Sequence, residues 1–233
     1  LALLLAALER RENALEGLMA HLPRAEDRDA TIEALARLEP VVRVLRQVAP
    51  GVPVHAAAST AALSHEEARF DLVRPGIALH GIDPDGAAAA TGVSLAATVA
   101  VRARIGRGRE VAAGTPVGYG GTWTASRATR LAVVALGYDD GLPYRCSNKG
   151  AFLVHGVRCP IVGTVMMDYV VCDVSSAPPV VAGDVATAIG RDGAETIAVE
   201  EVARNAGMIP SAVTCGLGRR VRRVVVDAAR VSE

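Results

Sequence analysis

The stretch Thr115–Asp168 reads TPVGYGGTWTASRATRLAVVALGYDDGLPYRCSNKGAFLVHGVRCPIVGTVMMD. Its short Val-rich runs are separated by Gly, Pro and Asp, a pattern that predicts antiparallel strands joined by turns. Glycines on both sides of Tyr119 allow backbone conformations that a side chain would forbid. Such a turn can hold a phenol at a defined angle. Taken alone, the motif also fits a tight hairpin with an ordinary packed tyrosine.

Two further segments of this stretch have the composition of turns. They are Gly137–Gly141, with the sequence GYDDG, and Ser147–Gly150, with the sequence SNKG. The second contains Lys149, the only lysine of the chain. A lysine that acts as a nucleophile needs a desolvated site, so a turn is a poor place for it.

Outside this stretch, a change of composition marks a domain boundary. Residues 83–92 are turn-forming and low in complexity, and we place the boundary between residues 86 and 87. Residues 93–105 alternate in the manner of a strand, and residues 196–206 carry apolar positions on one helical face. We therefore expect a mainly antiparallel β domain over residues 87–233.

The first domain, residues 1–86, alternates between helical and strand patterns. We expect helices at residues 1–12, 27–47 and 60–68, and strands at residues 14–21, 51–55 and 72–81, the last with a loop at its centre. Such alternation predicts a parallel sheet with helical crossovers. About three strands are present, so the domain is about half of a (β/α)8 barrel. The predicted fold class is α/β plus β.

Polar residues stand at the C-terminal ends of these strands, where barrel enzymes place their chemistry. His21 ends the first strand, His55 ends the second and Ser59 follows it. Arg74 lies inside an apolar strand, and its permanent charge must be paired or face a cavity. The alternatives are a core histidine bonded to a carbonyl for His21 and a surface arginine before a Pro-Gly turn for Arg74.

Composition narrows the class of partner. The chain has 233 residues, 51% hydrophobic and 3% aromatic, and its 25 basic side chains balance 25 acidic ones. This balance gives no field to attract nucleic acid or an anionic membrane, and no apolar run reaches the length of a membrane span. The four cysteines lack metal-ligand spacing, which predicts reduced thiols, a cytoplasmic protein and no metal site. The opening run from Leu1 does not predict a signal peptide, and we expect a fragment of a longer protein.

From about Gly17 onward, the order of these motifs resembles bacterial alanine racemases, which use pyridoxal 5'-phosphate (PLP). The resemblance implies that Tyr119 is one of two catalytic bases and that His21 packs against the PLP ring. It implies that Arg74 bonds the pyridine nitrogen of PLP and that His55 orients Arg74. Further implied contacts are Ser59, Gly76 and Ile77 with the cofactor phosphate, and Met167 and Asp168 with the substrate.

The chain departs from the family pattern at several positions. Ala58 replaces an asparagine, His80 replaces a tyrosine, Tyr144 and Thr164 replace arginines, and Ser211 falls where a tyrosine contacts the phosphate. These changes bear on PLP binding or on substrate choice. No residue matches the family's lysine that holds the cofactor covalently, or the arginine that pairs with the tyrosine base.

The resemblance implies an enzyme that interconverts L- and D-alanine for peptidoglycan synthesis, as an obligate homodimer with shared active sites. In that arrangement Tyr119 acts in the barrel of the partner subunit. A non-catalytic truncated or degenerate homologue that only associates is the main alternative. A generic β-barrel binding module is a third, although it leaves Arg74 and His55 without a role. Alanine, serine and other small amino acids are not distinguished by these motifs.

Overall fold

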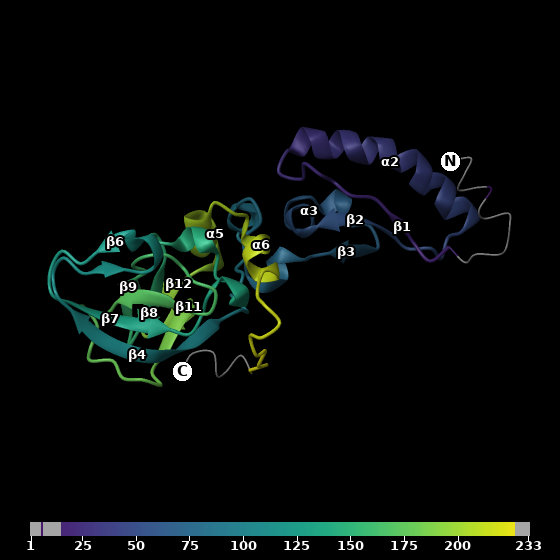
Figure 1. Cartoon of the computed structure of the whole chain (residues 1–233). Helices are drawn as coiled ribbons and strands as arrows, with labels where there is room; N and C mark the ends of the chain where they lie inside the picture. The colour runs from purple at the N-terminus through teal and green to yellow at the C-terminus, as the bar shows by residue number, and fades with distance from the viewer. Residues whose placement is uncertain (1–5, 7–14, 227–233) are drawn as a thin grey trace. The chain divides into compact units, whose positions relative to one another are not determined.

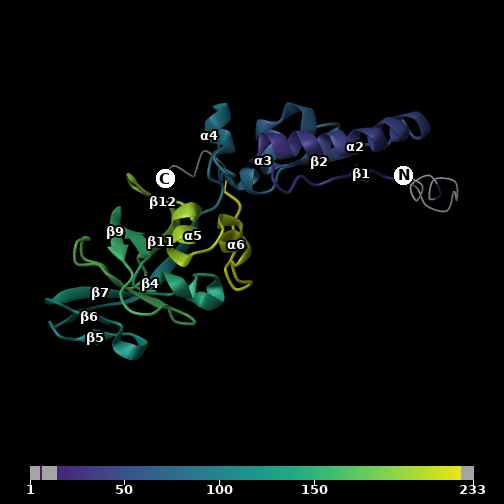
Figure 2. The ribbon, with the colours of Figure 1, turned by 90° about the horizontal axis from the view of Figure 1, so that it is seen from above.

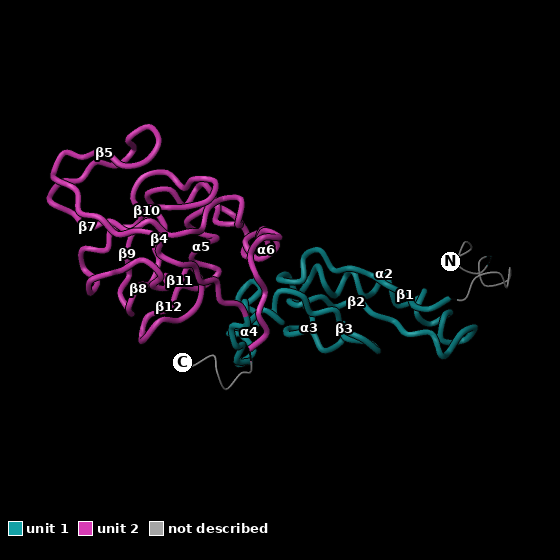
Figure 3. Tube along the Cα trace, turned by 60° about the horizontal axis from the view of Figure 1, so that its bottom comes forward, with its two compact units in different colours: residues 1–98 teal, residues 99–233 magenta. Residues whose placement is uncertain are grey.

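The computed structural model describes residue 6 and residues 15–226. The chain forms two compact units, residues 1–98 and residues 99–233 (Figure 3). Apart from residue 6, the helix predicted for residues 1–12 lies outside the described residues. The predicted domain boundary between residues 86 and 87 stays a prediction. A division of the structure into compact units is a different property from the domain boundary of a protein family.

The first unit contains a parallel sheet with the strand order β1-β2-β3 (Figure 1). A long helix, α2, joins β1 to β2, and two short helices, α3 and η1, join β2 to β3. The strands are β1 (Leu18–Met19), β2 (Val54–Ala58) and β3 (Leu72–Arg74), and the helices are α2 (Arg28–Val48), α3 (Ser59–Ser64) and η1 (Glu66–Ala68). This confirms the predicted alternation and the α/β class of this part.

Helix α2 follows the sequence prediction within one residue at each end. Its N-cap is Asp27, whose side chain accepts a hydrogen bond from the amide of Ala30 at 3.0 Å. Ala34, Leu35 and Leu38 pack on a buried alanine-rich cluster that includes residues of β2 and α3. Packing of this apolar face, more than intrinsic propensity, stabilises the helix.

Several predicted elements of this unit have other bounds than expected. The strand predicted for residues 51–55 is displaced to Val54–Ala58, so His55 lies near its start and does not end it. Within residues 15–21, which the structure describes, strand pairing is limited to β1. The helix predicted for residues 60–68 is broken at His65, which has extended backbone angles. The strand predicted for residues 72–81 ends at Arg74, because Pro75 has no N–H to donate to a ladder. Residues beyond it form a 3-10 helix, η2 (Ile77–His80), and the predicted linker contains a short helix, α4 (Ala87–Thr91).

The second unit is an antiparallel sheet with the order β10-β7-β4-β11-β8-β9, and β12 pairs with β11. The bridge between Ile161, which follows β9, and Cys172 in β10 joins the two ends, so the sheet closes into a barrel. The strands are β4 (Val101–Val111), β7 (Thr129–Val134), β8 (Ala151–Val154), β9 (Val157–Pro160), β10 (Val170–Asp173), β11 (Val185–Asp192) and β12 (Glu195–Ile197). The predicted antiparallel β fold is therefore confirmed.

Two predictions in this unit needed correction at their ends. The strand predicted for residues 93–105 begins at Val101 and runs to Val111, with an irregular register near Gly106. The helix predicted for residues 196–206 is α5 (Val199–Ala206), because the preceding residues pair in β12. A further helix, α6 (Pro210–Cys215), follows. None of the described helices is long and apolar enough to cross a lipid bilayer.

A two-stranded arm extends the second unit (Figure 2). Its strands are β5 (Pro116–Val117) and β6 (Trp123–Thr124), which pair antiparallel. A hydrophobic cluster fixes the arm: it combines Val117, Trp123 and Ala125 with residues that include Leu131, Val162 and Val171. Two strands of this length are not stable alone, so the cluster decides where the connecting turn lies.

Candidate active site

The first part of the site is the pair formed by Arg74, which ends β3, and His55, which is the second residue of β2. The Nη1 atom of Arg74 lies 2.7 Å from the Nδ1 atom of His55, which confirms that the two side chains are within hydrogen-bond reach. Arginine offers only donors, so Nδ1 must accept and the proton of a neutral imidazole must sit on Nε2. The pair therefore fixes both the direction of the guanidinium and the tautomer of His55.

Backbone carbonyls complete the support of Arg74. Its Nη2 atom donates to the carbonyl oxygen of Ala20 at 2.9 Å and to that of Ala56 at 3.1 Å. The guanidinium thus ties β3 to the middle of β2 and to the residue that follows β1. Within the described residues, its Nε–H and one Nη1–H have no acceptor. This geometry is not that of a surface arginine before a turn, and it leaves donors for a further group.

Ser59 organises the loop that follows Arg74. Its buried Oγ accepts hydrogen bonds from the amide of Gly76 at 2.9 Å and from the amide of Ala78 at 3.3 Å. Because the oxygen already accepts twice, the hydroxyl proton is free to donate. The amide of Gly76, which we expected to face the phosphate, is used by Ser59 instead. Among the described residues the amide of Ile77 has no acceptor.

Space is open beside this loop. A Cβ atom added to Gly76 would meet no atom within 4 Å. The Ser59 hydroxyl and the Ile77 amide are therefore two donors next to an unfilled volume, which is the arrangement that an anion needs.

His21 is exposed and directly follows Ala20, whose amide donates to the carbonyl oxygen of His55 at 3.0 Å. The alternative of a core histidine is therefore wrong for His21. It describes His65, which is buried with its Nε2 atom 2.8 Å from the carbonyl oxygen of Ala25. The Nδ1 atom of His65 has no partner in the described structure.

In the second unit, Tyr119 stands on the turn that joins β5 to β6. It opens a 3-10 helix, η3 (Tyr119–Gly121), and 76% of its surface is exposed. Gly118 and Gly120 have φ angles of 74° and 73°, a region that favours glycine. The alternative of an ordinary packed tyrosine is therefore wrong, and the phenol is presented to solvent by a turn of fixed shape.

The backbone before Tyr119 abuts a second glycine turn. A Cβ atom on Gly163 would lie 2.8 Å from the carbonyl oxygen of Val117, and one on Gly118 would lie 3.3 Å from the amide nitrogen of Thr164. Only glycine permits so close an approach at these positions. The hydroxyl of Thr164 is buried beside Gly118 and has no partner in the described residues.

Met167 and Asp168 belong to a turn that packs on the GYDDG segment. The amide of Tyr138 donates to the carbonyl oxygen of Met166 at 2.9 Å, and that of Asp139 donates to Met167 at 3.1 Å. Met167 is 52% exposed. Its role toward a substrate stays a prediction.

The carboxylate of Asp168 already forms an ion pair within this unit. Its Oδ1 atom lies 2.8 Å from Nη1 of Arg220, whose Nε atom lies 3.0 Å from both Asp139 and Asp140. Hydrogen bonds to Asp168 and then to Asp140 raise the pKa of Arg220. Arg220 was not predicted as part of the site, because no local sequence pattern links it to carboxylates so distant in the chain.

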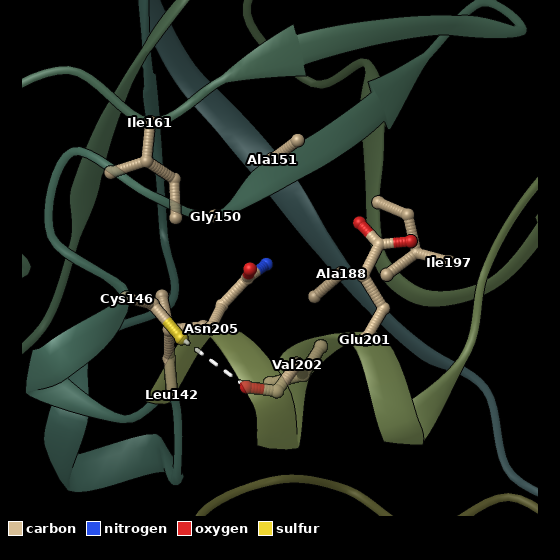
Figure 4. Close-up of a pocket in the computed structure, with 10 residues that line it drawn as sticks. All are labelled: Leu142, Cys146, Gly150, Ala151, Ile161, Ala188, Ile197, Glu201, Val202 and Asn205. Carbon is tan, nitrogen blue, oxygen red and sulfur yellow. Dashed lines mark hydrogen bonds between the residues drawn. The ribbon is translucent and has the colours of Figure 1, made fainter. Parts of the chain in front are cut away.

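A small cavity in the second unit does not extend the site (Figure 4). It has about 10 Å³ of room for the centre of a water-sized molecule, which is enough for one water at most. The thiol of Cys146 is directed at the carbonyl oxygen of Val202, and burial raises its pKa to about 11. Lys149, three residues later, is exposed.

Comparison with known proteins agrees with both units. Residues 98–225 match the model for the alanine racemase C-terminal domain, and residues 1–84 match the model for the alanine racemase N-terminal domain. The alanine racemase of Symbiobacterium thermophilum is 38% identical over 223 residues, which cover 94% of this chain and 58% of that protein. That of Sorangium cellulosum is 38% identical over 230 residues, with 95% and 60% covered.

Solved structures give the same result. Alanine racemase from Streptomyces coelicolor matches with a TM-score of 0.83 and 31% identity, covering 94% of this chain and 58% of that one. The Bartonella henselae enzyme, described with covalently bound pyridoxal phosphate, matches with a TM-score of 0.80 and 30% identity, covering 96% and 61%. The chain thus spans less than two thirds of the length of these relatives. By its sequence and its fold, it belongs to the alanine racemase family.

Proposed function

We propose that this chain is part of a PLP-dependent racemase that interconverts L-alanine and D-alanine. The observation that carries the proposal is the Arg74–His55 pair, held by the carbonyls of Ala20 and Ala56 in the parallel sheet that also leads into the Ser59 loop. Two relatives support the choice of ligands. The Bartonella henselae enzyme was solved with covalently bound pyridoxal phosphate, and the Bacillus anthracis enzyme was solved with bound L-Ala-P.

The residues of the first unit fit PLP. The Ser59 hydroxyl and the Ile77 amide are donors beside the open space at Gly76, as a phosphate requires. The remaining N–H groups of Arg74 suit a pyridine nitrogen, which accepts a hydrogen bond when it carries no proton. We assign His21 to the face of the ring, because it follows the strand end that Arg74 holds.

PLP supplies an electron sink for the charge that develops when the α-proton of the amino acid is removed. Arg74 controls the strength of that sink. Its guanidinium keeps its own proton at any physiological pH, so it donates a hydrogen bond to the ring nitrogen without protonating it. The sink is therefore weaker than with a protonated ring, which limits side reactions such as transamination.

Tyr119 is proposed to remove or return the α-proton on one face of the substrate. Use of the phenol as a base at neutral pH requires preferential stabilisation of its anion. Cationic groups near the phenol would have to provide it. The exposure of Tyr119 leaves its hydroxyl accessible to such groups and to a substrate. The main-chain N–H of Met167, with Asp168 beside it, is proposed to face the substrate carboxylate.

Because Tyr119 and the Arg74 cluster belong to different units, we propose that the enzyme works as a homodimer with shared sites, in which Tyr119 serves the partner's barrel. We further propose a cytoplasmic enzyme that supplies D-alanine for peptidoglycan. The four cysteines are free, which fits a reducing compartment. One observation favours a non-catalytic homologue: the only lysine, Lys149, is exposed in a turn.

A chimera tests these two functions. The N-terminal portion of the Symbiobacterium thermophilum relative would be joined to this chain, and D-alanine would be measured with a coupled oxidase. We expect racemisation by the chimera and none above the rate of free PLP by the 233-residue chain alone, which lacks a suitably placed lysine. A chimera that shows PLP absorbance but forms no D-alanine would favour the non-catalytic homologue.

A further inference from the structure

The turn that carries Tyr119 is built from flexible parts. Three of its residues are glycines with positive φ angles, namely Gly118, Gly120 and Gly121. Glycine loses more conformational freedom on folding than any other residue, so a turn rich in glycine needs external contacts to keep one shape. The β5–β6 pair below the turn has only two residues in each strand and cannot supply them alone.

One side chain outside the arm holds this turn on both sides. The Nδ2 atom of Asn148 donates to the hydroxyl of Thr122 at 3.1 Å, directly after η3. Its Oδ1 atom accepts from the amide of Gly163 at 2.6 Å. Gly163 lies against the carbonyl of Val117, just before the turn. The two polar atoms of the Asn148 side chain therefore hold the chain after Tyr119 and the glycine that lies against the chain before it.

Asn148 is itself rigidly placed. Its φ angle is 57°, in the left-handed region that asparagine tolerates better than most residues. The adjacent amides of Lys149 and Gly150 donate to the carbonyl oxygen of Cys146 at 3.0 Å and 2.9 Å. Ser147 accepts from the amide of Val165 at 2.9 Å, so the SNKG turn is fastened to the same strand connection as Gly163.

We infer that Asn148 is a positioning residue for the Tyr119 turn. Its amide holds the phenol at one angle by joining Thr122 to Gly163, and it does not contact the reacting atoms itself. The functional consequence rests on the proposed role of Tyr119 as a base, because a base must lie within hydrogen-bond reach of the proton that it removes. The structural consequence does not depend on that role.

Hydrogen exchange on the 233-residue chain tests the structural part. Asn148→Gly removes the amide and keeps a residue suited to the positive φ, and Thr122→Val removes the partner hydroxyl. In peptides covering residues 116–124, we expect Asn148→Gly to raise exchange by about tenfold or more, since two net hydrogen bonds are lost. Thr122→Val should raise it less. Thr122→Ser keeps a hydroxyl and should behave as wild type.

Lys149→Gln is the matched control, since it changes the neighbouring exposed residue of the same turn and should leave exchange unaltered. Peptides from β7 should also exchange at the wild-type rate in every variant. The inference is overturned if Asn148→Gly leaves residues 116–124 unchanged, if Thr122→Ser loosens them as much as Thr122→Val, or if β7 loosens equally.

A second measurement separates this inference from the proposed function. In an active racemase that contains this chain, Asn148→Gly should slow solvent exchange of the α-proton of L-alanine more than that of D-alanine. If the turn loosens in the chain while both exchange rates stay unchanged, the role of Tyr119 as a base is contradicted. Asn148 then still positions the turn, and the inference stands without its catalytic consequence.

Discussion

Replacing Tyr119 with phenylalanine separates the chemistry of the phenol from its packing. The variant keeps the ring and removes only the oxygen. Tyr119 is 76% exposed, and its hydroxyl has no hydrogen bond within the described residues. We therefore expect the free energy of unfolding to change by no more than about 0.5 kcal/mol, as for other surface substitutions.

The expected effect on catalysis is far larger. Removal of a general base typically slows a reaction by about 10²–10⁴-fold. This corresponds to roughly 2.7–5.4 kcal/mol in the activation free energy, at 1.36 kcal/mol for each factor of ten. PLP absorbance should be retained, because the proposed cofactor contacts lie in the other unit of the chain.

The assay is racemisation by the active chimera, combined with solvent exchange of the α-proton. Loss of the L-specific base should slow exchange from L-alanine more than exchange from D-alanine, since a second base acts on the other face. Near-normal racemisation by Tyr119→Phe would mean that the exposed tyrosine is not a base, and the proposed mechanism would have to be abandoned.

Three further predictions follow from the geometry of the described residues. Gly163→Ala should destabilise the chain by about 2–5 kcal/mol in urea unfolding, because a φ of 83° disfavours alanine and its Cβ would lie 2.8 Å from a β5 carbonyl. Gly183 has a φ of 98° but open space around its Cβ position, so Gly183→Ala should lose only the part of the unfolding free energy that depends on φ. Equal losses of stability for the two alanine variants would refute the steric argument. A hydrogen bond from a β2 amide, and then the ion pair with α2, lowers the pKa of Asp71 below its usual 3.8. The stability that this carboxylate contributes is present above about pH 4 and is lost as the pH falls further, so the unfolding free energy should decline more steeply for wild type than for Asp71→Asn. A thiol reagent at pH 8 should label Cys215 first, because the other cysteines are buried and burial raises their pKa values; equal labelling rates for all four would contradict the buried positions.

Local sequence patterns predicted the helices and strands whose stability depends on residues close by in the sequence. Helix α2 begins after Asp27 because an aspartate side chain can accept from an amide three residues later. Alternation of apolar and polar residues located β4, but it did not locate its ends. Those ends depend on which strand lies alongside, as the irregular register with β7 near Gly106 shows.

The charge of Arg74 within an apolar strand required a partner or a cavity, and the resemblance to alanine racemases implied that the partner is His55. The sequence did not indicate which carbonyls would support the guanidinium. It also gave no sign that the amide of Gly76 would donate to Ser59, which leaves the hydroxyl proton and the Ile77 amide to face the open space.

By itself the sequence determined the two kinds of architecture, the position of Arg74 at the end of a parallel strand, and the glycine turn that exposes Tyr119. These features depend on backbone freedom and on hydrophobic periodicity, which are properties of neighbouring residues. Only the tertiary structure decided that Asn148 joins Thr122 to Gly163, and that Arg220 pairs with Asp140. These partners are separated by 26, 15 and 80 residues, and only packing of the folded chain brings them within hydrogen-bond distance.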